Sequence, residues 1–169
     1  MVITFLQRML WMVALVAAQM MVFNYMHLFG YATPLPFIYF LLLFPRGTQR
    51  WSILLWGFIC GLLCDVVSLT PGIGAASMTL IAFVQPLFLE HMVPKDAVDD
   101  LQPGIDTMGF WSYVRYAGLL TFLFSLCYFL VLSFNFFHIV DLGLSFVSSW
   151  LLTLLLCLSF EGVRSKRNG

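Results

Sequence analysis

Residues 51–93 read WSILLWGFICGLLCDVVSLTPGIGAASMTLIAFVQPLFLEHMV, and this stretch contains two apolar runs separated by Thr70, Pro71 and Gly72. Each run approaches the roughly 20 mostly apolar residues that a helix needs to cross a bilayer. Proline followed by glycine is typical of a tight turn. The stretch therefore predicts a hairpin of two membrane-spanning helices, at 51–69 and 73–93, the second kinked at Pro86.

The composition of the whole chain favours the same class. Of its 169 residues, 62% are hydrophobic and only 9% are charged, whereas soluble domains carry about 25% charged residues. The net charge is zero, so nothing indicates nucleic-acid binding. The length suggests one domain, residues 1–169. We expect an all-α polytopic membrane protein.

Hydropathy predicts four further spans. Residues 9–29 are too long an apolar run for the h-region of a cleaved signal peptide, so we expect a retained first span. Residues 35–44 are apolar but cover only about 15 Å as a helix. This segment spans only if irregular backbone buried in protein contributes as well. The expected single transmembrane domain is a six-helix bundle with spans at 9–29, 34–45, 51–69, 73–93, 111–137 and 141–163.

The basic residues give this topology an orientation. With six spans, all the lysines and arginines fall on one side of the membrane. Cytoplasmic loops carry the Lys and Arg excess of membrane proteins, so both termini are expected in the cytoplasm. The opposite side then holds only short turns. The basic residues are Arg8, Arg46, Arg50, Lys95, Arg115, Arg164, Lys166 and Arg167.

Asp65 is the most informative single residue, because a carboxylate within a span is costly and normally faces the bundle interior or a partner. It is a candidate for an ion relay, a ligand contact or a partner contact. The alternative is a structural role, in which Asp65 accepts hydrogen bonds from the nearby turn, for example from Ser68 or Thr70.

Asp65 continues a stripe of small residues. Gly57, Gly61 and Asp65 are four residues apart and share one helix face, and Gly-x-x-x-Gly is a close-packing motif of membrane helices. The stripe packs the third span either within this chain or against another one. We therefore regard Gly57, Gly61 and Asp65 as candidates for partner binding or helix packing.

Small residues also open the fourth span, beginning with Gly72 and Gly74. Free amides at a helix start hold anions, and Asp65 is a candidate for that position. Tight packing of the two spans is the simpler interpretation. Gly72 and Gly74 complete the set of candidate residues.

Other polar residues are scattered. Gln19, Asn24 and Gln85 are candidates for hydrogen bonds between helices. The four cysteines lie in apolar stretches and resemble small buried hydrophobic residues. We find no catalytic set, no metal-ligand spacing and no cofactor motif, and therefore expect no enzyme and no cofactor.

Residues 56–83 resemble the rod-shape-determining MreD family. That family combines a Gly-x-x-x-Gly-x-x-x-Asp helix with a short glycine-rich turn and a helix that opens with small residues. The positions here are Gly57, Gly61, Asp65, Ser68, Gly72, Gly74 and Ala82. The turn 69–72 and the long acidic loop 94–109 depart from the family pattern, which weakens any cytoplasmic contact inferred for that loop.

The resemblance implies a non-enzymatic scaffold of cell-wall elongation in the bacterial inner membrane. Its implied protein partners are the bitopic MreC protein, actin-like MreB and the elongation-specific peptidoglycan synthases. Membrane lipid is a further expected partner. The family is similar in fold to the substrate-binding subunits of energy-coupling-factor vitamin transporters. The main alternative is therefore a small-molecule transport subunit, with Asp65 in a ligand pocket. The third interpretation is an intramembrane enzyme.

Overall fold

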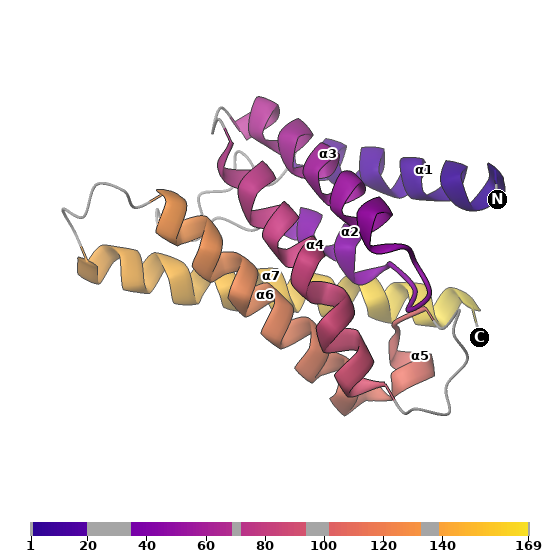
Figure 1. The fold of residues 1–169 in the computed structure, drawn as a ribbon. Helices are drawn as coiled ribbons and strands as arrows, with labels where there is room; N and C mark the ends of the chain where they lie inside the picture. The colour runs from indigo at the N-terminus through magenta and orange to yellow at the C-terminus, as the bar shows by residue number, and fades with distance from the viewer. Residues whose placement is uncertain (1, 20–34, 69–71, 94–101, 133–138, 169) are drawn as a thin grey trace.

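The computed structural model describes residues 2–19, 35–68, 72–93, 102–132 and 139–168, and all its regular elements are helices (Figure 1). The two spans predicted after the central hairpin, 111–137 and 141–163, overlap α6 and α7. In chain order the helices are α1 (Val2–Ala18), the 3₁₀ helix η2 (Pro36–Ile38), α2 (Tyr39–Leu42), α3 (Arg50–Ser68), α4 (Ile73–Met92), α5 (Ile105–Met108), α6 (Phe110–Leu132) and α7 (Ile139–Asn168).

Three of the described helical segments are long and apolar enough to cross a membrane: Ile73–Met92, Phe110–Leu132 and Ser145–Ser165. Most of their outward side chains are apolar, as with Phe83 at 60% exposed and Leu155 at 64% exposed. Polar side chains such as Asp65 and Glu161 are instead buried. This inverted distribution matches a lipid environment, and the protein is membrane-embedded.

The predicted second span is not a spanning helix over its described residues. Residues 36–42 form η2 and α2, which together cover only about 12 Å. Every residue from 35 to 42 is buried, and Phe37 to Leu42 are at most 2% exposed. Pro36 starts the element, and the chain leaves it before Pro45. The part of this prediction that concerns residues 28–34 lies outside the described residues.

Side chains of the short segment contact four longer helices. Tyr39 packs against Trp11 of α1 and Phe160 of α7, with ring centroids 6.1 and 5.6 Å apart. Phe37 meets Phe124 of α6 at 5.3 Å, and Phe40 meets Trp56 of α3 at 6.1 Å. The buried core is therefore centred on this segment.

One end of the bundle gathers segments from the whole chain. The N-terminal end of α1, the C-terminal end of α7 and α5 lie together on the right of Figure 1. Arg50 at the start of α3 and Glu90 at the end of α4 are 3.9 Å apart. Arg164 of α7 reaches the residues that precede α5. Arg8, Arg50 and Arg164 belong to these segments, and Arg46 lies between α2 and α3.

Helices α3 and α4 pack through the predicted glycine stripe. A Cβ atom placed on Gly61 would lie 2.6 Å from the carbonyl oxygen of Gly74 and 2.7 Å from the Cα of Ala75. On Gly57 it would lie 2.9 Å from the Cβ of Ala82. Real Cβ contacts are not this short, so the two backbones touch where the stripe runs. The stripe packs the hairpin within the chain.

We predict that Gly61→Ala destabilises the protein by about 1–3 kcal/mol, because the added methyl group meets backbone atoms that cannot give way. Gly61→Leu is expected to be worse. Gly143→Ala is the matched control, since a Cβ at Gly143 meets nothing within 4 Å and alanine favours a helix. The apparent melting temperature in mild detergent measures both. Equal melting temperatures for the two alanine variants would contradict the packing described above.

Candidate functional site

Asp65 caps the start of α4. Its Oδ1 accepts a hydrogen bond of 2.7 Å from the backbone N–H of Gly74, and its Oδ2 accepts one of 2.8 Å from the N–H of Ala75. The first N–H groups of a helix have no partner within the helix. Asp65 is 5% exposed, so both bonds lie away from solvent and are charge-assisted.

The anion position at the start of α4 is therefore occupied by a side chain of the same chain. The sequence analysis named Asp65 as a candidate for this position, at the free amides of the small residues that open the fourth span. The structural interpretation named Ser68 and Thr70 as donors. The two bonds described here come from Gly74 and Ala75, and Thr70 lies outside the described residues.

The remaining candidate glycines serve the same contact. A Cβ on Gly74 would lie 2.6 Å from Asp65 Oδ1, so only glycine lets the carboxylate approach. Gly72 precedes α4 with φ +85°, a left-handed conformation that glycine adopts without strain. The structure thus brings Gly57, Gly61, Asp65 and Gly74 together between α3 and α4, with Gly72 at the turn.

The outer side of this hairpin is an open apolar groove. Phe58 of α3 and Phe83 of α4 flank it, and the small side chains of Ala75, Ala76 and Thr79 form its floor. Phe58 and Phe83 are 46% and 60% exposed. The stripe itself faces the other helix, so a partner that approaches the hairpin meets this groove, which Gly72 also lines, and not Gly57 or Gly61.

Gln85 links helices, as its position in the fourth span led us to expect. Its Nε2 donates to the Tyr116 hydroxyl of α6 at 2.8 Å and to the carbonyl oxygen of Phe44 at 3.4 Å. Gln19 is buried at the end of the described part of α1, and Asn24 lies outside the described residues. Gln85 therefore joins α4 to α6 and to the segment that follows α2.

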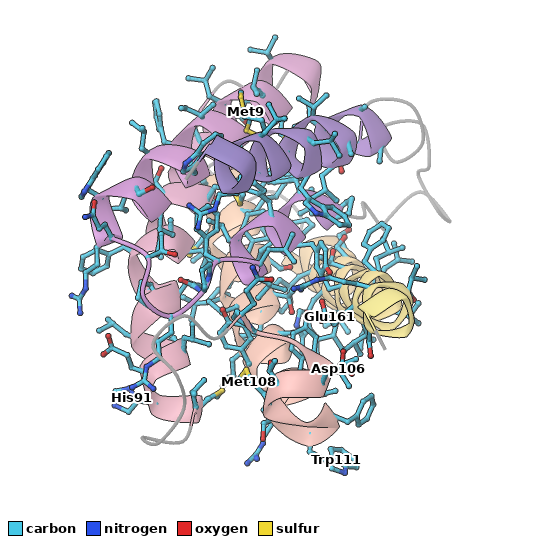
Figure 2. All side chains as sticks on the ribbon, turned by 90° about the vertical axis from the view of Figure 1, so that its right-hand side faces the viewer. Met9, His91, Asp106, Met108, Trp111 and Glu161 are labelled. Atoms are coloured by element: carbon cyan, nitrogen blue, oxygen red, sulfur yellow. The ribbon has the colours of Figure 1, made fainter. Side chains whose placement is uncertain are left out.

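A second polar cluster surrounds Glu161 on α7, a residue that the sequence analysis did not single out. Glu161 is 2% exposed. The hydroxyl of Tyr39 donates to its Oε2 at 2.7 Å, and Arg164 Nη1 lies 3.2 Å from the same oxygen. Arg164 Nη2 also donates to Gln102 Oε1 at 2.7 Å. Figure 2 looks along the bundle from this end, with Glu161 on α7 near Asp106 of α5.

Gly104 leaves room for the carboxylate of Glu161, as Gly74 does for that of Asp65. A Cβ on Gly104 would lie 2.7 Å from Glu161 Oε1. One signal in the sequence pointed to the cluster: Glu161 is the sole acidic residue of 142–163, and Arg164 follows three positions later. Tyr39 and Gln102 had no such signal, because they are 122 and 59 positions away from Glu161 along the chain.

The two sites are hydrogen-bonded clamps between helices. Asp65 joins α3 to α4, Glu161 joins α7 to α2, and its neighbour Arg164 joins α7 to the residues before α5. Within the described ranges no group of three His, Cys, Asp or Glu residues is placed to hold a metal ion. The four cysteines are free thiols; Cys127 is half-buried and the other three are buried.

The chain matches no protein-family model, no curated protein and no solved structure.

We predict that Asp65→Ala destabilises the protein by about 1–3 kcal/mol, because two buried N–H groups lose their acceptors. Hydrogen exchange at Gly74 and Ala75 should accelerate, as followed by mass spectrometry of peptides covering 72–80. Val66→Ala is the control, since Val66 is 68% exposed and faces away from α4. Unchanged exchange in Asp65→Ala would show that the cap contributes nothing to the start of α4.

For the second cluster, we predict that Arg164→Met destabilises by about 3–5 kcal/mol, since it leaves the buried carboxylate of Glu161 without its counter-charge. The double variant Glu161→Gln/Arg164→Met should recover much of this loss. Arg50→Met is the control, because the Arg50–Glu90 pair has side chains 64% and 50% exposed and such pairs contribute about 0–1 kcal/mol. Melting temperatures that simply add in the double variant would contradict the coupling.

Proposed function

We propose that this protein is a non-enzymatic scaffold of the bacterial cell-wall elongation machinery in the inner membrane. In this proposal the chain crosses the membrane six times with both termini in the cytoplasm, and the second crossing uses the short buried segment around residues 36–42 in place of a full-length helix. It maintains rod shape by binding an MreC-like bitopic protein and by coupling, directly or through that partner, to actin-like MreB and to the elongation-specific peptidoglycan synthases.

The observation that carries the proposal is the hairpin of α3 and α4. The 28 residues that resemble the MreD family, 56–83, lie in this one unit, and the residues that define the resemblance hold it together. Gly61 admits the backbone of α4, and Asp65 caps that helix. Because these residues fix the shape of the α3–α4 hairpin, the hairpin can offer a constant surface to a partner, as a scaffold requires.

The outer groove of the hairpin is the contact that we assign to the partner. Its floor of Ala75, Ala76 and Thr79 has the small side chains that let membrane helices approach closely. Phe58 and Phe83 at its borders supply apolar contact area. In the proposal, the single membrane helix of the MreC-like protein lies in this groove.

The polar clusters support a structural role for the buried carboxylates. Asp65 and Glu161 both direct their oxygens at donors of the same chain. The gathering of basic residues at one end of the bundle supports the proposed orientation, because the positive-inside rule places that end in the cytoplasm.

Depletion in the rod-shaped host, followed by complementation, tests the proposal. We expect depleted cells to become round and the wild-type chain to restore rods. Ala76→Leu fills the groove floor and should fail to restore them, and affinity capture in mild detergent should lose the MreC-like protein. Ala14→Leu is the matched control, since Ala14 lies on the exposed side of α1.

Two outcomes would contradict the proposal. Depleted cells that stay rod-shaped would exclude a role in elongation. A stoichiometric vitamin-like ligand on the captured protein, seen by native mass spectrometry without a membrane partner, would favour the transport alternative. Full complementation by Ala76→Leu would exclude the groove as the partner contact and leave the scaffold role to another face.

A further inference from the structure

The first turns of α6 carry an arginine that faces away from the other helices. Arg115 lies within a segment that is long and apolar enough to cross a membrane, and it is exposed. Trp111, one turn earlier on the same helix face, is 75% exposed, and Figure 2 shows it projecting outward from this end of the bundle. Leu119, one turn later, is 43% exposed. This face of α6 therefore changes from an indole and a guanidinium to apolar side chains.

The level of Trp111 in the membrane follows from α3 and α4. Gln85 of α4 donates to the Tyr116 hydroxyl of α6, and the two helices run in opposite directions (Figure 1). Glu90 lies five residues further along α4 and Trp111 five residues back along α6, each about 7.5 Å from that bond. Glu90 pairs with Arg50 at the start of α3. Ionisable and aromatic side chains of three helices therefore share one level, which is typical of a membrane interface.

Arg115 lies one helical turn deeper than this level, about 6 Å into the span. The ion pairs among the described residues are Arg50–Glu90 and Arg164–Glu161, so none of these residues supplies a counter-charge to Arg115. An arginine that faces lipid extends its side chain toward the headgroups, because an unpaired charge in hydrocarbon is costly. The lipid headgroups are therefore the source of a counter-charge for this side chain.

The donors on this face suit a phosphate group. Arg115 directs its Nε at the carbonyl oxygen of Trp111, 3.4 Å away, which leaves its two Nη groups as a fork. Such a fork pairs with phosphate oxygens through two parallel hydrogen bonds. The indole N–H of Trp111 has no acceptor among the described residues, and the Phe110 ring packs edge-on against the indole with centroids 5.8 Å apart. Two donor groups therefore lie one turn apart on a surface that faces lipid.

We propose that Arg115 and Trp111 bind the phosphate of an anionic phospholipid at this end of the bundle. Cationic side chains near the membrane surface attract anionic lipids. A zwitterionic headgroup carries its own ammonium group, which competes with the arginine for the same phosphate. The acyl chains of the bound lipid lie along the exposed side chains of Leu119 and Phe122. The site requires a membrane-embedded bundle and does not depend on the proposed scaffold function.

Native mass spectrometry of the full chain in neutral detergent tests the proposal, with dioctanoyl phosphatidylglycerol and dioctanoyl phosphatidylcholine as probes. The wild-type protein is expected to bind phosphatidylglycerol about fivefold more tightly than phosphatidylcholine. Arg115→Met should abolish this preference. Arg115→Lys should retain part of it, because lysine keeps the charge but lacks the fork. Arg50→Met is the matched control, since it removes an equal charge from the same end of the bundle, and it should leave the preference unchanged.

A second variant tests the site without changing its charge. Trp111→Phe keeps an aromatic ring and removes the indole N–H, and it should weaken phosphatidylglycerol binding about threefold. Unchanged binding in both Arg115→Met and Trp111→Phe would overturn the proposal. Equal losses in Arg115→Met and Arg50→Met would overturn it as well, because they indicate general surface charge. Displacement of phosphatidylglycerol by millimolar potassium phosphate would show that the site takes a free anion and would exclude the lipid.

Discussion

The backbone of a membrane-embedded chain has to satisfy its own polar groups, and the rest of this structure depends on how that is done at the interrupted helices. The first N–H groups of α4 are completed by Asp65, which accepts from Gly74 and Ala75. The N–H of Leu35, at the start of the short buried segment, donates to Thr153 Oγ1 of α7 at 3.2 Å. At these two starts the backbone N–H groups thus take an acceptor from another helix. Because those acceptors come from different helices, the bonds also fix how the helices sit against each other.

The sequence contained enough information to predict the hairpin but not the core around it. Local spacing identified Gly61 and Asp65, since both act on the helix that follows them directly in the chain. The structure refines that interpretation. Gly57 and Gly61 pack against α4 and are therefore not available to a partner. Tyr39 and Glu161 could not be paired from the sequence, because 122 positions separate them and no periodicity links them. The sequence also gave no reason to expect that residues 36–42 would lie at the centre of the core.

That central position follows from the length of the segment and from its composition. Seven helical residues are too few to cross the hydrocarbon region, and an isolated short helix would expose unsatisfied backbone groups to lipid. Burial among four longer helices solves both problems, and the aromatic side chains of Phe37, Tyr39 and Phe40 fill the space between those helices. Polar contacts then lie inside the bundle and apolar side chains outside, which is the reverse of a water-soluble domain.

The buried segment has a consequence for biosynthesis. Leu35 and Tyr39 leave the ribosome before their hydrogen-bonding partners Thr153 and Glu161, which lie 118 and 122 positions later in the chain. Until α7 is present, the Leu35 N–H and the Tyr39 hydroxyl lack the acceptors that they have in the folded protein. The core around this segment is therefore completed only once α7 has joined the helices that precede it.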